Sequence, residues 1–290
     1  MRKLARLVSS TYAFIVHLLP WWFNTLFAKF IAWLWVDVLN LRRKVVYSNM
    51  DIAFPGTADE TKKQWMKKSI YVLARGIVDL ARVPYVSEKW INENVIFHGL
   101  ENLPKDQGFF ILTLHLGGGD LGAAIMSEKI VPLSLISKRF SNPFADEFWF
   151  SLRTKSKTEF IDAHGKNNAF EILKALRLKR AIVFVLDQFM GKPYGIETEF
   201  FGKKTGTAYG LALFALKTKA PVLPLYSYWD EANKLHIGID PAVKIDDVPT
   251  DDKLEAQRII TNRFNAALES IIKRWPAQWM WVHRRWKDFE

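Results

Sequence analysis

The chain has 290 residues, of which 49% are hydrophobic, and it contains no cysteine. This length and composition suffice for a large buried core and exclude a disordered chain. The lack of cysteine excludes disulfides, a thiolate nucleophile and cysteine-based zinc sites. The six histidines show no metal-ligand spacing, so we expect neither a metal nor a bound cofactor. A net charge of +11 with twelve tryptophans favours an anionic partner, either nucleic acid or a membrane.

The N-terminal segment decides between these two partners. From Tyr12 to Leu41 it is mostly aromatic and aliphatic, and basic residues flank it on both sides, as in segments whose ends meet anionic headgroups. Pro20 predicts a break or kink, so the segment is either one slightly polar span or a bent helix lying in the membrane interface. We therefore expect residues 1–45 to bind membrane lipids, residues 46–290 to form one domain, and nucleic acid not to be a partner.

The pattern of strands and helices in the remainder of the chain predicts an α/β fold. After a helix from about residue 57 to Arg82, short apolar strands alternate with helical patterns from residue 109 onward. This alternation predicts a central, mostly parallel or mixed sheet flanked by helices. The strands are expected at 109–114, 131–136, 181–186 and 221–229, with 235–243 as a hairpin partner. The helices are expected from the end of the first strand to Ile130, at 143–155, 168–179 and 206–217, and from residues 250–252 to Trp275.

The run from Phe109 to Gly122 predicts a catalytic site. An apolar strand ends at His115, Asp120 falls in the first turn of the next helix, and between them lie Gly117, Gly118 and Gly119. A glycine turn that folds the carboxylate back onto one imidazole nitrogen leaves the other nitrogen free to take a proton from a hydroxyl. We predict that His115 is a general base oriented by Asp120, with the glycine amides binding developing negative charge. The alternative is a buried histidine satisfied by a helix-capping aspartate.

Later segments add candidate binding residues near strand ends, where α/β proteins gather ligand groups. Arg139 can clamp a phosphate, although a surface cation explains it as well. Asp187 and Gln188 end another strand, on the same edge as His115. Lys203 and Thr205 lie in a predicted turn before a helix, whose amides can contact anionic oxygens. Taken singly, Asp187 and Lys203 are better explained by ordinary turn chemistry.

These residues belong to an ordered series of motifs along nearly the whole chain. The series includes the hydrophobic N-terminal segment, His115-x4-Asp120, Asp187-Gln188, Phe200-Phe201-Gly202 and the terminal run from Pro276 to Lys287. Together they resemble the lipid A biosynthesis acyltransferases, the lauroyl and myristoyl transferase family within the lysophospholipid-acyltransferase-like superfamily. The resemblance implies a glycerolipid-acyltransferase-like fold and an enzyme at the cytoplasmic face of the bacterial inner membrane. It also implies transfer of an acyl chain from acyl carrier protein, or acyl-CoA, to a hydroxyl of a phosphorylated glycolipid.

One departure from the family pattern leaves the substrates open. Family members usually have Asn-Trp-Glu where this chain has Gly118-Gly119-Asp120, so a bulky residue is lost and the carboxylate is shorter. The sequence therefore leaves open the length of the transferred acyl chain and the identity of the acceptor. A lysophospholipid, an ornithine lipid or a mannoside is an alternative acceptor. Two hypotheses from other functional classes remain: a catalytically silent lipid-binding homologue, and a hydrolase that uses the same His115 and Asp120 on water. For Trp279 and Trp281 we favour anchoring of the tail to the core over a role in the site.

Overall fold

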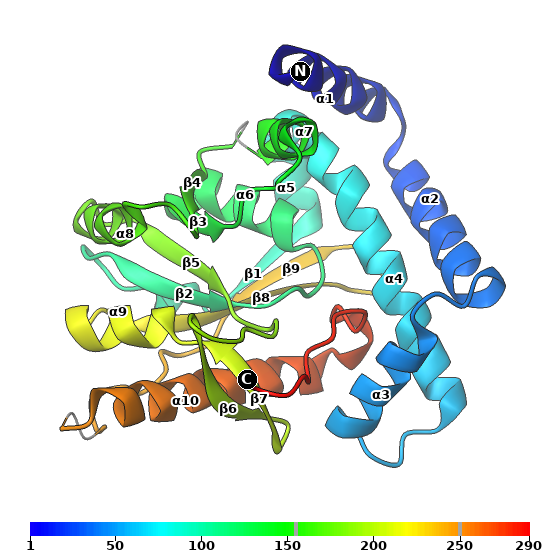
Figure 1. Cartoon of the computed structure of the whole chain (residues 1–290). Coiled ribbons are helices and arrows are strands. Elements are labelled where there is room, and N and C mark those ends of the chain that lie inside the picture. Colours follow the sequence, from blue (N-terminus) through cyan, green and yellow to red (C-terminus); the bar gives the residue numbers. More distant parts are fainter. Residues whose placement is uncertain (154–155, 249–250) are drawn as a thin grey trace.

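The computed structural model describes residues 1–153, 156–248 and 251–290, and it is built around a twisted sheet (Figure 1). Within these residues, a seven-stranded sheet has the order β1-β9-β8-β2-β5-β3-β4, and a separate hairpin is formed by β6 and β7. The strands are β1 (Val95–His98), β2 (Phe109–Thr113), β3 (Leu133–Ser137), β4 (Glu159–Asp162), β5 (Ala181–Val185), β6 (Gly195–Phe200), β7 (Lys203–Ala208), β8 (Val222–Trp229) and β9 (Leu235–Ile239).

The sheet is mostly parallel, as the sequence predicts. Strands β8, β2, β5, β3 and β4 run parallel to one another, and β9 pairs antiparallel with β8 as its expected hairpin partner. The parallel strands β2 and β5 are continuous apolar runs buried on both faces, which is the composition that helices on both sides of a sheet require. The α/β class is therefore confirmed.

Helices cover both faces of this sheet (Figure 1). The α-helices are α1 (Arg2–Leu18), α2 (Trp21–Trp33), α3 (Arg43–Ala53), α4 (Asp59–Arg82), α5 (Glu88–Asn94), α6 (Gly119–Lys129), α7 (Pro143–Arg153), α8 (Asn168–Arg177), α9 (Gly210–Thr218) and α10 (Lys253–Arg274). Short helices of other types are η1 (Leu34–Val38), η2 (Val83–Tyr85), η3 (Leu100–Asn102) and η4 (Pro276–Gln278).

The hydrophobic core divides along the sheet because successive strand residues point to opposite faces. Phe110 and Leu112 of β2 pack with residues of α4, α8, α9 and α10. Phe109 and Ile111, which alternate with them, pack with residues of α5 and α6 on the other face. Burial on both faces holds β2 firmly, so the residues that follow it have a fixed starting direction.

The N-terminal segment is bent at the proline. α1 and α2 meet at Pro20 with an angle of 110° between them, which confirms the predicted break. Among the described helices none is long and apolar enough by itself to cross a membrane, while this bent pair passes the same test only when both helices are taken together. Both helices also pack on the rest of the chain, since Arg6 pairs with Glu147 of α7 at 2.5 Å and Asn24 donates to Asp79 of α4 at 2.8 Å.

The structure corrects one predicted element. Residues 200–207 form the β6–β7 hairpin instead of a turn before a helix, and α9 begins only at Gly210. The threonines on alternate positions of this hairpin, Thr198, Thr205 and Thr207, are buried, as β-branched residues suit a pleated surface. The predicted helix end at Lys155 and helix start at Thr250 lie outside the described residues.

Candidate active site

The register of two adjacent strands brings His115 and Asp187 together. β2 and β5 are parallel neighbours in which Thr113 pairs with Val185, so His115 and Asp187 each lie two residues beyond the same pair. The backbone continues this pairing for one more step, because the amide of Leu186 donates to the carbonyl of Thr113 at 3.1 Å. Two residues that are 72 positions apart in the chain therefore meet at the carboxyl edge of the sheet.

Asp187 is the carboxylate that holds the imidazole. Its Oδ1 lies 2.8 Å from Nδ1 of His115, and its Oδ2 accepts from the His115 amide at 2.9 Å and from Trp279 Nε1 at 2.8 Å. Because an ionised carboxylate only accepts, Nδ1 carries the proton and Nε2 keeps its lone pair. Asp187 is 1% exposed, whereas the His115 side chain is 42% exposed. Nε2 is thus the nitrogen that can act on a substrate.

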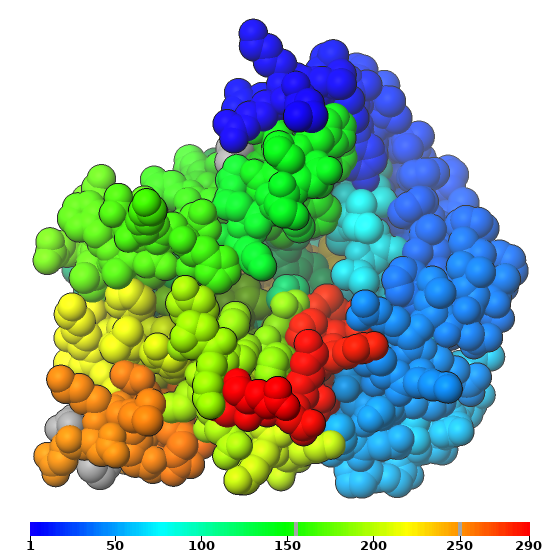
Figure 2. Space-filling view, in the orientation of Figure 1, coloured from blue at the N-terminus to red at the C-terminus, as the bar shows by residue number. Residues whose placement is uncertain are grey.

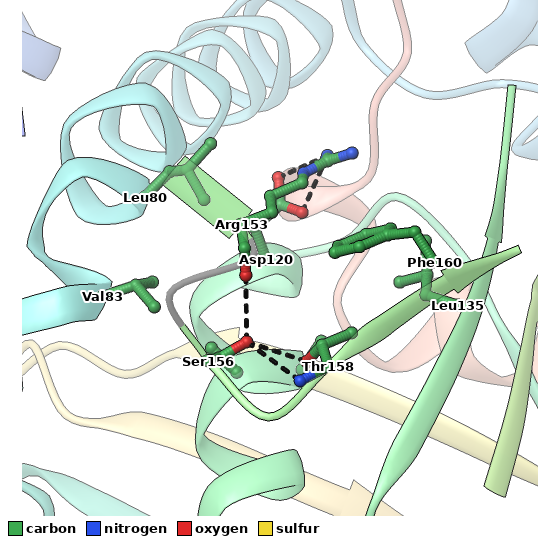
Figure 3. Close-up of a pocket in the computed structure, with 10 residues that line it drawn as sticks. Leu80, Val83, Asp120, Leu135, Arg153, Ser156, Thr158 and Phe160 are labelled. Carbon is green, nitrogen blue, oxygen red and sulfur yellow. Dashed lines mark hydrogen bonds and ion pairs between the residues drawn. The ribbon is translucent and has the colours of Figure 1, made fainter. Parts of the chain in front are cut away.

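The expectation that Asp120 holds the imidazole is wrong. Asp120 does lie in the first turn of α6, as predicted, but its carboxylate oxygens lie 2.8 and 2.9 Å from Nη2 of Arg153 at the end of α7 (Figure 3). Asp187 occupies Nδ1 of His115, and Arg153 binds the Asp120 carboxylate instead. Asp120 and Arg153 nevertheless both affect the pKa of His115 through their charges, Asp120 raising it and Arg153 lowering it.

Burial and neighbouring charges shift the pKa values of both His115 and Asp187. Burial lowers the pKa of His115, but the Asp187 carboxylate and its hydrogen bond outweigh burial, and Asp120 adds to them, so that the pKa of His115 is raised. Burial of Asp187 acts to raise its pKa. The charge of His115 and the hydrogen bonds that His115 and Trp279 donate outweigh burial, so the pKa of Asp187 is lowered. An ionised carboxylate therefore supports an imidazole that gains a proton readily.

The C-terminal segment completes the site. Met280 donates its amide to the carbonyl of His115 at 3.0 Å, and Gly117 donates to the carbonyl of Gln278 at 3.4 Å. Trp279 is 1% exposed, so the predicted anchoring of the tail is confirmed, yet its indole also binds Asp187. Asn49 of α3 holds the segment from the other side through its amide, which donates to the carbonyls of Trp281 and His283. Sequence reasoning missed Trp279 as a donor, and no local pattern signals a contact 92 residues away.

A second imidazole lies in the same electrostatic environment. Burial lowers the pKa of His283 to about 4, and the charges of Asp187 and His115 also act on this pKa, Asp187 raising it and His115 lowering it. It is therefore neutral near pH 7. Its Nδ1 is buried and lacks a hydrogen-bond partner among the described residues.

Of the other predicted binding residues, Arg139 and Thr205 are bound to partners outside the His115–Asp187 pair. Arg139 donates to Asp146 at 2.6 Å and stacks on Phe150, which makes it a partnered cation of the α7 start. Thr205 is fully buried in the hairpin and donates to the carbonyl of Arg285, so it has no surface for a ligand. Lys203 is exposed at the beginning of β7, and Gln188 is half-buried next to Asp187. The arginine that the structure brings near His115 is Arg153.

The surface is hollowed near the C-terminal segment. Figure 2 shows a recess between this segment, drawn in red, the cyan α4 and the green residues above them. A small pocket lies behind the Asp120–Arg153 pair, with Leu80, Val83, Leu135 and Phe160 among its walls (Figure 3). Its volume of about 10 Å³ matches one water molecule and is too small for an acyl chain.

The glycines before α6 have different roles. Gly117 has φ +58°, and a Cβ there would lie 2.1 Å from the carbonyl oxygen of Ser227, so only glycine fits. At Gly119 nothing lies within 4 Å of an added Cβ. The amides of Gly119, Asp120 and Leu121 belong to the first turn of α6, which leaves such groups free for an anion.

This contrast predicts a larger loss of stability for one of two alanine substitutions. Gly117→Ala should lower the free energy of unfolding by about 1–3 kcal/mol because it combines a strained φ with a backbone collision. Gly119→Ala should change it by less than about 1 kcal/mol, since alanine suits a helix start that is open. Denaturant unfolding of the two variants beside the wild type measures both. Equal stability of the two variants would contradict the geometry of the turn.

Comparison with known proteins matches this arrangement to one family. The family model described as bacterial lipid A biosynthesis acyltransferase matches residues 5–288. A lipid A biosynthesis acyltransferase of Haemophilus influenzae is 22% identical over 247 residues, covering 83% of this chain and 74% of the relative. The lipid A biosynthesis palmitoleoyltransferase of Escherichia coli is 22% identical and covers 92% of each chain. The lauroyltransferase of Escherichia coli is 23% identical, with coverage of 86% and 80%.

The α/β fold carries a histidine–aspartate pair at the carboxyl edge of its sheet, and the family model matches the chain over residues 5–288. The protein is therefore an acyltransferase. The family predicted from the sequence is thus confirmed. The chain belongs to the bacterial lipid A biosynthesis acyltransferases.

Proposed function

We propose that this protein transfers a fatty acyl chain from an acyl thioester, carried by acyl carrier protein or CoA, to a hydroxyl of a lipid A precursor. The observation that carries the mechanism is the His115–Asp187 pair, with Nδ1 bound to a buried carboxylate and Nε2 on the exposed side. The names of the relatives support lipid A as the acceptor class. A phosphorylated acceptor and an acidic carrier also suit a chain of net charge +11.

The reaction runs by direct attack on the thioester. Nε2 of His115 takes the proton of the acceptor hydroxyl as its oxygen bonds to the acyl carbon, and Asp187 stabilises the imidazolium that forms. The C–S bond then breaks, and the imidazolium returns the proton to the leaving thiolate, which gives the ester and a free thiol. The chain has no cysteine, so no acyl-cysteine intermediate forms on it.

Two groups near His115 suit the negative charge that develops on the carbonyl oxygen. One is the first turn of α6, with its free amides and the positive end of its dipole. The other is Arg153, which is fixed by Asp120 and whose Nε is buried without a partner among the described atoms. Asp120 in this scheme orients the arginine and raises the basicity of His115 through its charge.

The bent helices α1 and α2 are proposed to lie on the cytoplasmic surface of the inner membrane. Many large apolar side chains on these two helices are exposed although soluble proteins seldom expose a contiguous apolar surface. Basic residues lie next to them at Arg2, Lys3, Arg6 and Lys29, where anionic lipid headgroups would attract them. The exposed apolar residues of α1 and α2 are Leu4, Leu7, Val8, Phe14, Ile15, Leu18, Trp22, Leu26, Phe30 and Trp33, and Val38, Leu39 and Leu41 follow them in the chain.

The function is tested by product analysis with purified protein. An acyl thioester is supplied on acyl carrier protein or on CoA, alone and with a lipid A precursor, a lysophospholipid or an ornithine lipid. We expect an acylated lipid A precursor and one thiol released per ester formed. Acylation of another lipid in its place would overturn the acceptor, free fatty acid without acceptor would identify a hydrolase, and no turnover would identify a lipid-binding homologue.

A further inference from the structure

A groove separate from the catalytic residues lies at the bend between α1 and α2. Its volume is about 300 Å³, the size at which small-ligand sites begin. The bend itself is seen in Figure 1, where α1 and α2 lie at the edge of the molecule beyond α4. We call this hollow the elbow groove, and its walls include His17, Trp21, Arg82, Tyr85, Ser87 and Trp90.

Stacked rings hold the elbow groove open. His17 of α1 stacks on Tyr85 of η2 at 4.2 Å between ring centroids, and Trp21 of α2 stacks on Trp90 of α5 at 4.3 Å. Arg82 lies over the Trp21 ring at 4.4 Å. Its guanidinium donates to the carbonyl of Leu19 at 2.8 Å, which fixes it against the bend. The site is therefore preformed, with a guanidinium in its wall.

The buried charges of α4, the helix that carries Arg82, do not balance. Arg75 and Arg82 are 4% and 2% exposed. The buried carboxylate of Asp79 binds Arg75 at 3.1 Å and acts on Arg82 through its charge. Among the described residues, Asp79 is the one carboxylate whose charge acts on Arg82, and burial both lowers the pKa of Arg82 and raises the pKa of Asp79. Two buried cations against one anion leave an excess positive charge, which is costly unless another anion joins it.

We propose that the elbow groove binds the phosphate headgroup of an anionic phospholipid. The residues next to the groove walls in the chain are apolar and open to solvent, with Leu18 67% exposed and Trp22 65% exposed. A headgroup in the groove would thus place its acyl chains beside these side chains, and the tryptophans would sit at headgroup depth. The inference requires α1 and α2 to contact the membrane, but it requires no acyl transfer.

Ser87 offers a test that leaves the local fold intact. Its hydroxyl accepts from the amide of Trp90 as the N-cap of α5, and Asp and Asn cap as well as Ser. Ser87→Asp therefore adds a carboxylate to the groove wall, and Ser87→Asn is the neutral control of the same shape. Arg82 is a poorer choice because its replacement would also break the bonds to the bend.

The probe is dihexanoyl-phosphatidylglycerol, a soluble anionic phospholipid, titrated calorimetrically into the full chain in a non-ionic detergent. We expect binding to the wild type and to Ser87→Asn within about threefold, and weakening by at least about tenfold in Ser87→Asp. Equal binding by the Asp and Asn variants would overturn the proposal. Inorganic phosphate binding as tightly as the lipid would also overturn it, since the site would then hold a free anion. Acyl transfer plays no part in this titration, so its outcome is independent of the proposed reaction.

Discussion

His115→Ala is expected to lower kcat for acyl transfer by about 10²–10⁴-fold, the contribution of a positioned general base. Without Nε2 no group at the carboxyl edge of β2 takes the proton of the acceptor hydroxyl. The side chain is 42% exposed, so the fold should tolerate its loss. Initial rates with a radiolabelled acyl thioester and a lipid A precursor measure the effect, and thermal unfolding checks that the variant is folded.

The matched control is His98→Ala, which removes an exposed histidine from β1, an edge strand of the sheet. It should keep the wild-type rate. Retention of more than a tenth of the wild-type kcat by a folded His115→Ala variant would show that His115 is not the base.

Asp187→Asn is expected to be nearly as damaging, with a loss of about 10²–10⁴-fold in kcat. The amide has almost the shape of the carboxylate, but it offers Nδ1 either a weaker acceptor or a competing donor, and it does not stabilise the imidazolium. The indole of Trp279 and the amide of His115 would also lose a charged acceptor. Kinetic measurements on the folded variant give the size of the loss.

The same variant has a pH signature that a purely structural role would not produce. His115 acts as a base only when neutral, and Asp187 raises its pKa, so the wild-type rate should rise with pH through a pKa above the ordinary value of about 6.5. Asp187→Asn should move this acid limb to lower pH. Asp120→Asn should move it less, because Asp120 acts through its charge alone. A limb that stays in place in Asp187→Asn would contradict the assignment of Asp187.

The local part of the site was predictable, and the long-range part was not. The strand that ends just before His115, the glycine turn and the acidic first turn of α6 all follow from neighbouring residues. The partner of the imidazole depends instead on the order β2–β5 and on the register that pairs Thr113 with Val185. Two acidic residues were available for one histidine, and spacing along the chain favoured the wrong one.

The fold, like the site, was predictable where it depends on local sequence patterns. Alternating strands and helices predicted the mostly parallel sheet, and Pro20 predicted the bend between α1 and α2. The β6–β7 hairpin was missed because its glycine and lysines suggest a turn, although Thr205 and Thr207 carry the period-2 spacing of a strand. The tryptophans of the C-terminal segment were expected to anchor it to the core. The hydrogen bond from the Trp279 indole to Asp187 depends on where this segment packs, which no local pattern specifies.

The most direct test of the account is mass spectrometry of lipid A from cells that lack this protein and are complemented with the wild type or with His115→Ala. We expect lipid A to lose one acyl chain in the deletion strain and to regain it only with the wild type. Unchanged lipid A in the deletion strain, or full restoration by His115→Ala, would contradict the proposed acceptor or the proposed base, respectively.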